Sequence, residues 1–237
     1  MLYLLDTANV ETIERLVAVY PVAGVTTNQS ILSREGAAPG ALLRQIRAAI
    51  GEERMLHAQV TAHESGQMVR EALALCDAVG GNLYIKVPAT PQGLEALPAL
   101  KKQGLRVTVT ALFSAAQALL FARAGADFVA PFVSRLDNIG ANGVGVVEEI
   151  LTVFHRYGLA TRVLAASFRT PEQLRRLAQL GVDAATIAPP ILEALLWHPM
   201  TDDALKRFDA DWLKMTGGTQ SWVEQLARER EGGEPCC

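Results

Sequence analysis

Charged residues and cysteines are scarce in this chain of 237 residues. Lys and Arg number 22 and Asp and Glu number 25, so the net charge is −3, and charged residues make up 20% of the chain against 50% hydrophobic residues. This composition excludes a disordered chain, which has too little apolar surface to offset its conformational entropy. The small negative charge also argues against a nucleic-acid partner, because such proteins neutralise phosphates with clustered Lys and Arg.

Long apolar runs and targeting signals are missing as well. No segment approaches the roughly 20 apolar residues of a membrane helix, and the first residues lack the basic and apolar regions of a signal peptide. The three cysteines, Cys76, Cys236 and Cys237, lack the spacing of a disulfide framework. We therefore expect a cytoplasmic protein with reduced thiols and no membrane partner. The four histidines are scattered, which predicts no metal site, and we expect no cofactor.

Eight short apolar runs alternate with longer segments of helical periodicity. The runs are Leu2–Leu5, Val22–Val25, Leu56–Val60, Leu83–Val87, Val107–Ala111, Phe128–Val133, Val163–Ala166 and Ala184–Ala188. Such continuous runs are typical of parallel strands that are buried on both faces. Eight β/α units predict an α/β fold of the (β/α)8 TIM-barrel type, and the chain is just long enough, since this barrel takes roughly 250 residues.

A doubly wound open sheet is the alternative fold. It normally carries a glycine-rich fingerprint after its first strand, whereas the first run here is followed by Asp6-Thr7-Ala8-Asn9. We therefore expect the barrel over residues 1–198. Residues 199–237 are predicted to form C-terminal helices and a tail within the same domain.

The C-terminal segments predict helices over Ile191–Trp197, Asp202–Met215 and Trp222–Arg230, and a disordered tail over Glu229–Cys237. The second of these helices carries an apolar stripe that includes Phe208. Such a stripe needs a covering surface, either the barrel itself or a neighbouring subunit.

Almost every apolar run ends in a polar residue. Active sites of α/β barrels lie at the carboxyl ends of the strands, so these residues are the candidates for chemistry. They are Asp6, Thr26, Thr27, Asn28, Gln59, Lys86, Thr108, Thr110, Arg135, Ser167 and Arg169.

Lys86 is the most informative of these candidates, because it lies in an otherwise apolar run. Burial disfavours the charged form of a lysine and lowers its pKa, and a neutral amine can attack a carbonyl to form a Schiff base. The alternative is a lysine that reaches the strand mouth or pairs with Asp6. Asp6 itself is either an acid/base group or the N-cap of the helix that begins near Val10.

A phosphate site is predicted between the seventh run and the following helix. Ser167, Arg169 and the backbone N–H groups at the start of that helix are suitable anion ligands, and Arg135 is a second cation. The alternative is that both arginines are solvated surface residues.

Five motifs together resemble the transaldolase and fructose-6-phosphate aldolase family of small subunits. They are Leu5–Asn9, Ala23–Asn28, Ile85–Pro88, Ala130–Arg135 and Ala165–Pro171. The resemblance, which runs from Leu4 to about Trp212, implies an α/β barrel and a class I Schiff-base aldolase that needs no metal.

The resemblance also implies a role for each matching residue. Lys86 corresponds to the Schiff-base lysine and Asp6 to the acid/base that takes the proton from the C4 hydroxyl. Gln59 and Thr110 correspond to the pair that holds the catalytic water. Asn28 corresponds to the residue that hydrogen-bonds the dihydroxyacetone portion, and Arg135, Ser167 and Arg169 correspond to the phosphate-binding residues. We also expect Thr26 to bind substrate. Family members of this size form rings of five subunits, often stacked as decamers, so a homopentamer or homodecamer is expected.

One position departs from the family motif, and two markers of its subfamilies disagree with each other. Gln29 replaces the usual proline of a Thr-Thr-Asn-Pro-Ser motif. Gln59 resembles the fructose-6-phosphate aldolases, since transaldolases carry a glutamate there, whereas Phe132 resembles the transaldolases, since the aldolases carry a tyrosine. Both positions concern the water that hydrolyses the Schiff base.

We predict reversible cleavage of a sugar-phosphate substrate, fructose 6-phosphate, to dihydroxyacetone and glyceraldehyde 3-phosphate. One alternative is a transaldolase that transfers the dihydroxyacetone unit between sugar phosphates of the pentose phosphate pathway. The other is a non-catalytic barrel that binds sugar phosphates, in which Lys86 only forms an ion pair.

Overall fold

The computed structural model describes residues 1–219 and 221–231. The strands are β1 (Leu2–Asp6), β2 (Val22–Thr26), β3 (Met55–Gln59), β4 (Leu83–Pro88), β5 (Arg106–Leu112), β6 (Phe128–Pro131), β7 (Arg162–Ala165) and β8 (Ala184–Ile187). Each strand pairs in parallel with the next, and β8 pairs with β1, which closes a barrel. The fold is thus the predicted TIM barrel, and an open sheet is excluded.

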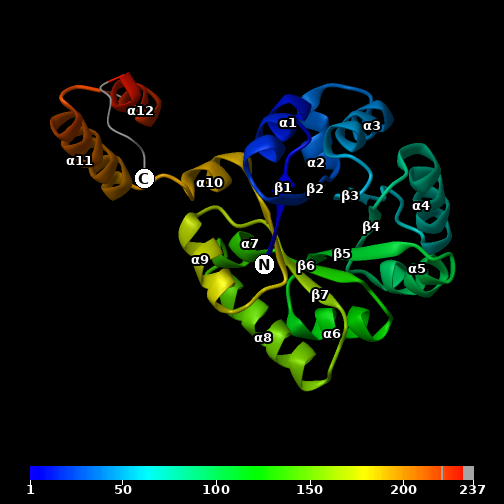
Figure 1. Cartoon of the computed structure of the whole chain (residues 1–237). Helices are drawn as coiled ribbons and strands as arrows, with labels where there is room; N and C mark the ends of the chain where they lie inside the picture. Colours follow the sequence, from blue (N-terminus) through cyan, green and yellow to red (C-terminus); the bar gives the residue numbers. More distant parts are fainter. Residues whose placement is uncertain (220, 232–237) are drawn as a thin grey trace. The chain divides into compact units, whose positions relative to one another are not determined.

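Helices connect the strands and surround them (Figure 1). They are α1 (Val10–Val19), α2 (Gln29–Leu32), the 3-10 helix η1 (Ser33–Glu35), α3 (Pro39–Ile50), α4 (Ser65–Val79), α5 (Pro91–Lys102), α6 (Ala115–Arg123), α7 (Val133–Asp137), α8 (Gly143–Arg156), α9 (Pro171–Gln179) and α10 (Pro189–Ala194). Two further helices follow, α11 (Pro199–Thr216) and α12 (Trp222–Glu231).

The chain divides into two compact units, and the division follows Leu192. The first unit contains the barrel. The second contains α11 and α12, where the indole rings of Trp212 and Trp222 contact each other with centroids 4.5 Å apart. Residues Glu229–Glu231 of the predicted tail belong to α12, which corrects that part of the expectation. The rest of the tail, with Cys236 and Cys237, lies outside the described residues.

Two local differences from the sequence expectation affect the site. The sixth strand ends at Pro131 rather than at Val133, because Phe132 makes only an isolated bridge to Ala166 and α7 begins at Val133. Arg135 therefore lies on a helix after the strand. Asn9, and not Asp6, caps α1, since the Asn9 side chain accepts a hydrogen bond from the backbone N–H of Thr12. Asp6 is thereby free of the capping role.

An aromatic layer fills the interior of the barrel below the site. The rings of His57 and Tyr84 stack with centroids 4.6 Å apart, and Phe128 meets both rings edge-on. The Arg162 guanidinium lies 4.0 Å from the centroid of the Phe128 ring and donates to the Tyr84 hydroxyl. Burial, together with the charges of Lys86 and Arg162, holds the pKa of His57 well below 6.5, so this layer contains a neutral imidazole.

Strand alternation explains why the reactive groups lie directly above this layer. Residues two apart on a strand point to the same face, so Lys86 follows Tyr84 on the inside of the barrel. The same holds for Gln59 after His57, and strand register places Gln59 beside Lys86. The aromatic residues thus form the floor on which the polar residues sit.

Candidate active site

Of the predicted strand-end residues, all but Thr27 and Thr108 line one cavity of about 440 Å³. The hydroxyls of these two threonines are instead bound to the carbonyl oxygen and to Nδ1 of His57. The predicted residues that line the cavity come from the carboxyl ends of the strands or from the segments that follow them: Asp6, Thr26, Asn28, Gln59, Lys86, Thr110, Phe132, Arg135, Ser167 and Arg169. Their proximity is the geometric expectation for an α/β barrel. Their individual roles in a reaction remain predictions.

Lys86 is buried, with 6% of its surface exposed. Its Nζ donates a hydrogen bond of 2.9 Å to the carbonyl oxygen of Thr27. Burial lowers the pKa of Lys86 from 10.5 to about 8, although the charge of Asp6 opposes the shift. With this pKa, about a tenth of the amine is neutral at pH 7 and about half at pH 8, and the neutral form is the one that attacks a carbonyl. The burial of Lys86 excludes the alternative in which its side chain reaches solvent at the strand mouth.

Asp6 is half-buried and lines the same cavity as Lys86. Its Oδ1 accepts a hydrogen bond of 2.8 Å from the Thr26 hydroxyl, which lies 2.6 Å from the Thr186 hydroxyl. Burial raises the pKa of Asp6, while the charges of Lys86 and Arg34 and the two threonine hydroxyls act in the opposite direction. A carboxyl group with a raised pKa exchanges a proton more readily at neutral pH than an exposed aspartate does. Asp6 therefore has the properties of an acid/base group.

Thr186 also lines the cavity, although it is not among the site residues predicted from the sequence. It interrupts the last apolar run, Ala184–Ala188. Its hydroxyl on β8 contacts that of Thr26 on β2, and both of these strands pair with β1, which carries Asp6. The signal was a single polar residue inside an apolar run, the same signal that singled out Lys86. Arg34 also lines the cavity and follows α2, where no strand-end rule applies.

Thr110 and Phe132 form another part of the cavity wall. The Thr110 hydroxyl is buried and has no hydrogen-bond partner among the described residues, so it is available to a bound molecule. The Phe132 ring lies edge-on to Phe113, with centroids 5.6 Å apart, and the Arg135 guanidinium lies 4.8 Å from its centroid. These contacts hold the Phe132 ring between an aromatic residue and a cation.

Two strained residues border this wall. Ala111 and Ser167 both have φ of 55°, a left-handed conformation that is unfavourable for residues other than glycine. Ala111 lies where the pairing of β5 with β6 shifts register between Val109 and Leu112. Such strain often accompanies functional sites, where the surrounding structure holds a side chain in one direction.

The candidate anion ligands lie at the exposed edge of the cavity. Arg135 and Arg169 both line the cavity and are both exposed. Their exposure agrees with the alternative that both are solvated surface residues. The backbone N–H groups of Arg169 and Thr170 donate to Oε1 of Gln173, and that of Gln173 donates to the Thr170 hydroxyl. These N–H groups are thus occupied, which leaves the Ser167 and arginine side chains as anion ligands.

Comparison with known proteins gives the family. The family model for Transaldolase/Fructose-6-phosphate aldolase matches residues 3–228. The chain belongs to this family. Among curated proteins, a "Probable transaldolase" of Exiguobacterium sp. is 41% identical over 212 residues, which cover 90% of this chain and 97% of that protein. A "Probable transaldolase" of Desulforamulus reducens is 40% identical over 216 residues, which cover 91% and 99%.

A solved structure supports the fold alone. A mandelate oxidase variant with an FMN adduct has a TM-score of 0.55 and 14% identity, and the match covers 80% of this chain and 64% of that chain. The family membership makes the transaldolase-family chain an enzyme of the Schiff-base aldolase and transaldolase class. The alternative of a non-catalytic barrel is therefore not supported.

Gln29 departs from the family motif, and its environment compensates for the missing proline. Gln29 is the first residue of α2, a position where proline is favoured, and Asn28 caps this helix through a bond from the N–H of Ile31. The Gln29 side chain donates to the carbonyl oxygen of Val60 at 2.9 Å. In this transaldolase-family chain the loop is thus held by hydrogen bonds.

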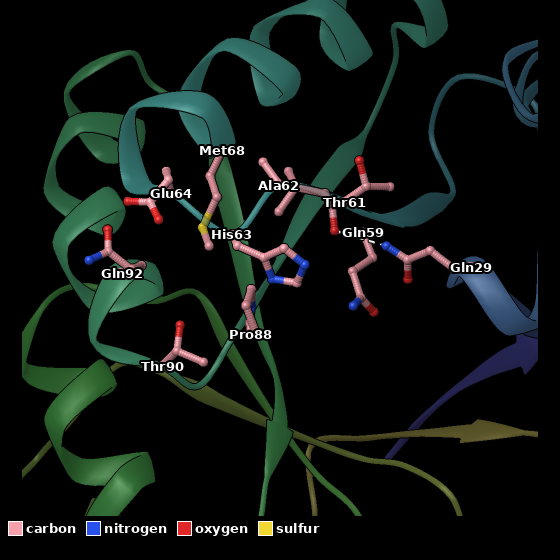
Figure 2. Close-up of a pocket in the computed structure, with 11 residues that line it drawn as sticks. Gln29, Gln59, Thr61, Ala62, His63, Glu64, Met68, Pro88, Thr90 and Gln92 are labelled. Atoms are coloured by element: carbon pink, nitrogen blue, oxygen red, sulfur yellow. Dashed lines mark hydrogen bonds between the residues drawn. The ribbon is translucent and has the colours of Figure 1, made fainter.

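A second pocket adjoins the cavity and shares Gln29 and Gln59 with it. Figure 2 shows these two side chains close to each other, with His63 beside them. The pocket has a volume of about 750 Å³. Its loop is held by Glu71, whose carboxylate accepts bonds from the N–H groups of Thr61 and Ala62.

The described residues contain neither a cluster of metal-binding side chains nor a membrane-spanning helix. Within residues 1–219 and 221–231, no group of three or more His, Cys, Asp or Glu side chains is placed to hold a metal ion. In the same part of the chain, no helix combines the length and apolar character needed to cross a membrane.

Proposed function

We propose that the protein is a fructose-6-phosphate aldolase, which reversibly cleaves this ketose phosphate to dihydroxyacetone and glyceraldehyde 3-phosphate. The observation that carries the proposal is the buried amine of Lys86, with a pKa of about 8, in one cavity with the carboxyl group of Asp6. An uncharged amine and a neighbouring acid/base group are what a Schiff-base aldolase needs.

The reaction follows from these groups. The Lys86 amine attacks C2 of the ketose, and loss of water gives the Schiff base. Asp6 takes the proton from the C4 hydroxyl, the C3–C4 bond breaks, and the electron pair moves into the Schiff base as glyceraldehyde 3-phosphate leaves. Protonation at C3 and attack of water at C2 then release dihydroxyacetone and restore the amine. We assign the orientation of this water to Gln59 and Thr110, and phosphate binding to Arg135, Ser167 and Arg169.

A transaldolase is the second candidate. It differs only after cleavage, because the three-carbon unit is held on Lys86 until a second aldehyde accepts it. Phe132 favours this candidate, since a phenylalanine ring has no hydroxyl with which to orient water. The curated relatives named above are also called probable transaldolases. Gln59 favours the aldolase through the resemblance, since fructose-6-phosphate aldolases carry glutamine where transaldolases carry a glutamate.

A steady-state assay separates the two candidates. We expect fructose 6-phosphate alone to yield glyceraldehyde 3-phosphate and dihydroxyacetone. If it yields neither, and sedoheptulose 7-phosphate forms when erythrose 4-phosphate is added, the protein is a transaldolase and our first proposal is wrong.

Phe132→Tyr will raise the ratio of hydrolytic cleavage to transfer. A hydroxyl at the end of this clamped ring supplies one hydrogen bond to the attacking water, which corresponds to roughly three- to tenfold in rate. The two rates are measured in the same assay, with and without erythrose 4-phosphate. Phe113→Tyr is the matched control, because Phe113 contacts Phe132 but does not line the cavity. An equal change in both variants, or none, would remove this account of Phe132.

We further propose that the protein assembles with copies of itself through its second unit. Several large apolar side chains of α11 and α12 are exposed, among them Phe208, Met215 and Trp222. Apolar groups on neighbouring turns of these helices need a covering surface. A second copy of the chain provides one, in keeping with the ring assemblies that the family resemblance implies.

Phe208→Glu is expected to lower the mass of the particle in sedimentation equilibrium. A carboxylate at this position places a charge in the buried contact, which disfavours association. Lys206→Glu, two residues away and also exposed, is the control and should leave the mass unchanged. A wild-type protein with the mass of one chain would refute the assembly.

A further inference from the structure

Gln173 connects the two segments that carry the candidate anion ligands. It is the third residue of α9, and its carboxamide faces two ways. Its Oε1 accepts hydrogen bonds from the backbone N–H of Arg169 at 2.8 Å and of Thr170 at 3.2 Å. Its Nε2 donates to Oδ2 of Asp137 at 2.6 Å. One side chain thus links the start of α9 to α7.

Ser134 completes the connection. Its hydroxyl lies 3.1 Å from Nε2 and 3.2 Å from Oε1 of Gln173. Its backbone N–H donates to the carbonyl oxygen of Ser167 at 2.8 Å. The other carboxylate oxygen of Asp137 accepts a bond of 2.8 Å from the N–H of Gly143, which fixes the end of this segment to α8.

Both arginines are close in sequence to groups that Gln173 binds. Arg135 follows Ser134 and precedes Asp137 by two residues, and the N–H of Arg169 is itself bound to Gln173. The two guanidinium groups repel each other in the absence of an anion, and both are exposed. Both side chains can bind one phosphate group only if their backbones are held at a suitable separation. If that separation is fixed before binding, less conformational entropy is lost when the phosphate binds.

We infer that Gln173 is a positioning residue that sets the separation of Arg135 and Arg169 and thereby the affinity for the phosphate end of the substrate. The inference rests on the proposed phosphate role of the arginines. Gln173 itself acts through the two segments and not on the reacting atoms. The Asp137 carboxylate is its partner, because that carboxylate accepts the bond that crosses between the segments.

The hydrogen bond between Gln173 and Asp137 can be tested by exchanging its donor and acceptor groups. Gln173→Glu keeps the acceptor for the N–H groups of Arg169 and Thr170, and so keeps the helix cap, but sets a carboxylate against Asp137. Asp137→Asn can keep an acceptor for Gly143 but then turns an amide donor toward the donor of Gln173. The double variant restores one donor and one acceptor, so the two changes should compensate each other.

Each single variant should raise the KM for fructose 6-phosphate and the dissociation constant for inorganic phosphate by roughly tenfold, and the double variant should recover most of this loss. Dihydroxyacetone carries no phosphate, so its trapping on Lys86 by borohydride should be unchanged in all three. Gln179→Glu is the matched control, because it makes the same substitution at an exposed position on the same helix.

The outcomes separate this inference from the proposed function. Unchanged phosphate binding in both single variants, a double variant no better than the singles, or a parallel loss of dihydroxyacetone trapping would each overturn the positioning role. Absence of phosphate binding in the wild type would overturn it too. If the wild type binds phosphate but fails to trap dihydroxyacetone, the proposed aldolase fails, while the phosphate-binding cycle still decides the role of Gln173.

Discussion

Lys86→Met will leave a folded protein that neither turns over fructose 6-phosphate nor is labelled by borohydride in the presence of dihydroxyacetone. Methionine has a similar shape but no amine, so the Schiff base cannot form. Removal of an essential nucleophile lowers turnover by roughly 10⁵-fold or more. The measurements are the steady-state rate and the mass of the peptide that contains residue 86. Lys102→Met, an exposed lysine at the end of α5, should retain both activities.

The same substitution has an expected effect on stability. The pKa of Lys86 is lowered from 10.5 to about 8 on folding, so the unfolded chain binds this proton more tightly. The shift costs roughly 3 kcal/mol of folding stability below pH 8, and the cost disappears above pH 10.5. Methionine avoids this cost but leaves the carbonyl oxygen of Thr27 without its donor. Lys86→Met should therefore unfold at a temperature no lower than the wild type near pH 7, and a large loss of stability would contradict this account.

Asp6→Asn will separate Schiff-base formation from carbon–carbon cleavage. Asparagine keeps an acceptor for the Thr26 hydroxyl but does not take the proton from the C4 hydroxyl. Loss of a positioned acid/base group lowers the rate by roughly 10² to 10⁴-fold, so cleavage of fructose 6-phosphate should fall by this amount. Dihydroxyacetone, which has no C3–C4 bond, should still be trapped on Lys86.

The pH dependence of trapping gives a second measure of the same variant. The negative charge of Asp6 raises the pKa of Lys86 against the effect of burial. In the wild type, trapping should increase as the pH rises through about 8, where the amine becomes neutral. Without the charge of Asp6, that increase should move to lower pH. Asp77→Asn, at an exposed position of α4, should leave the profile in place, and a shift of the Asp6→Asn profile to higher pH would refute the coupling.

The sequence predicts the barrel well because its signals are local and repeated. Eight apolar runs alternate with helical segments. At Thr90 and Thr170 a threonine followed by a proline, a sequence pattern typical of a helix start, caps a helix in the structure. The cavity residues were predictable for the same reason, since parallel strands bring their carboxyl ends together. Lys86 stands out because one charge interrupts an apolar run.

The remaining features depend on contacts that cross between distant elements. Nothing local to Gln173 shows that its amide reaches Asp137, which is 36 residues away. The same holds for the hydroxyl pair of Thr26 and Thr186, separated by 160 residues. The sixth strand was predicted too long because Phe132 and Val133 are apolar, yet α7 begins there. Hydrophobicity alone does not distinguish the end of a strand from the buried face of a helix.

The aromatic layer of the barrel determines where reactants can enter and leave the cavity. His57, Tyr84 and Phe128 pack against one another and close the barrel toward the amino ends of the strands. In the proposed reaction, ketose, water and both products would therefore share the opening beside Arg135 and Arg169. A fragment bound to Lys86 would sit deeper than the phosphorylated aldehyde, which would lie beside the exposed arginines. The aldehyde would then have to leave before the fragment on Lys86, so the closed end of the barrel would impose an order on the release of the two products.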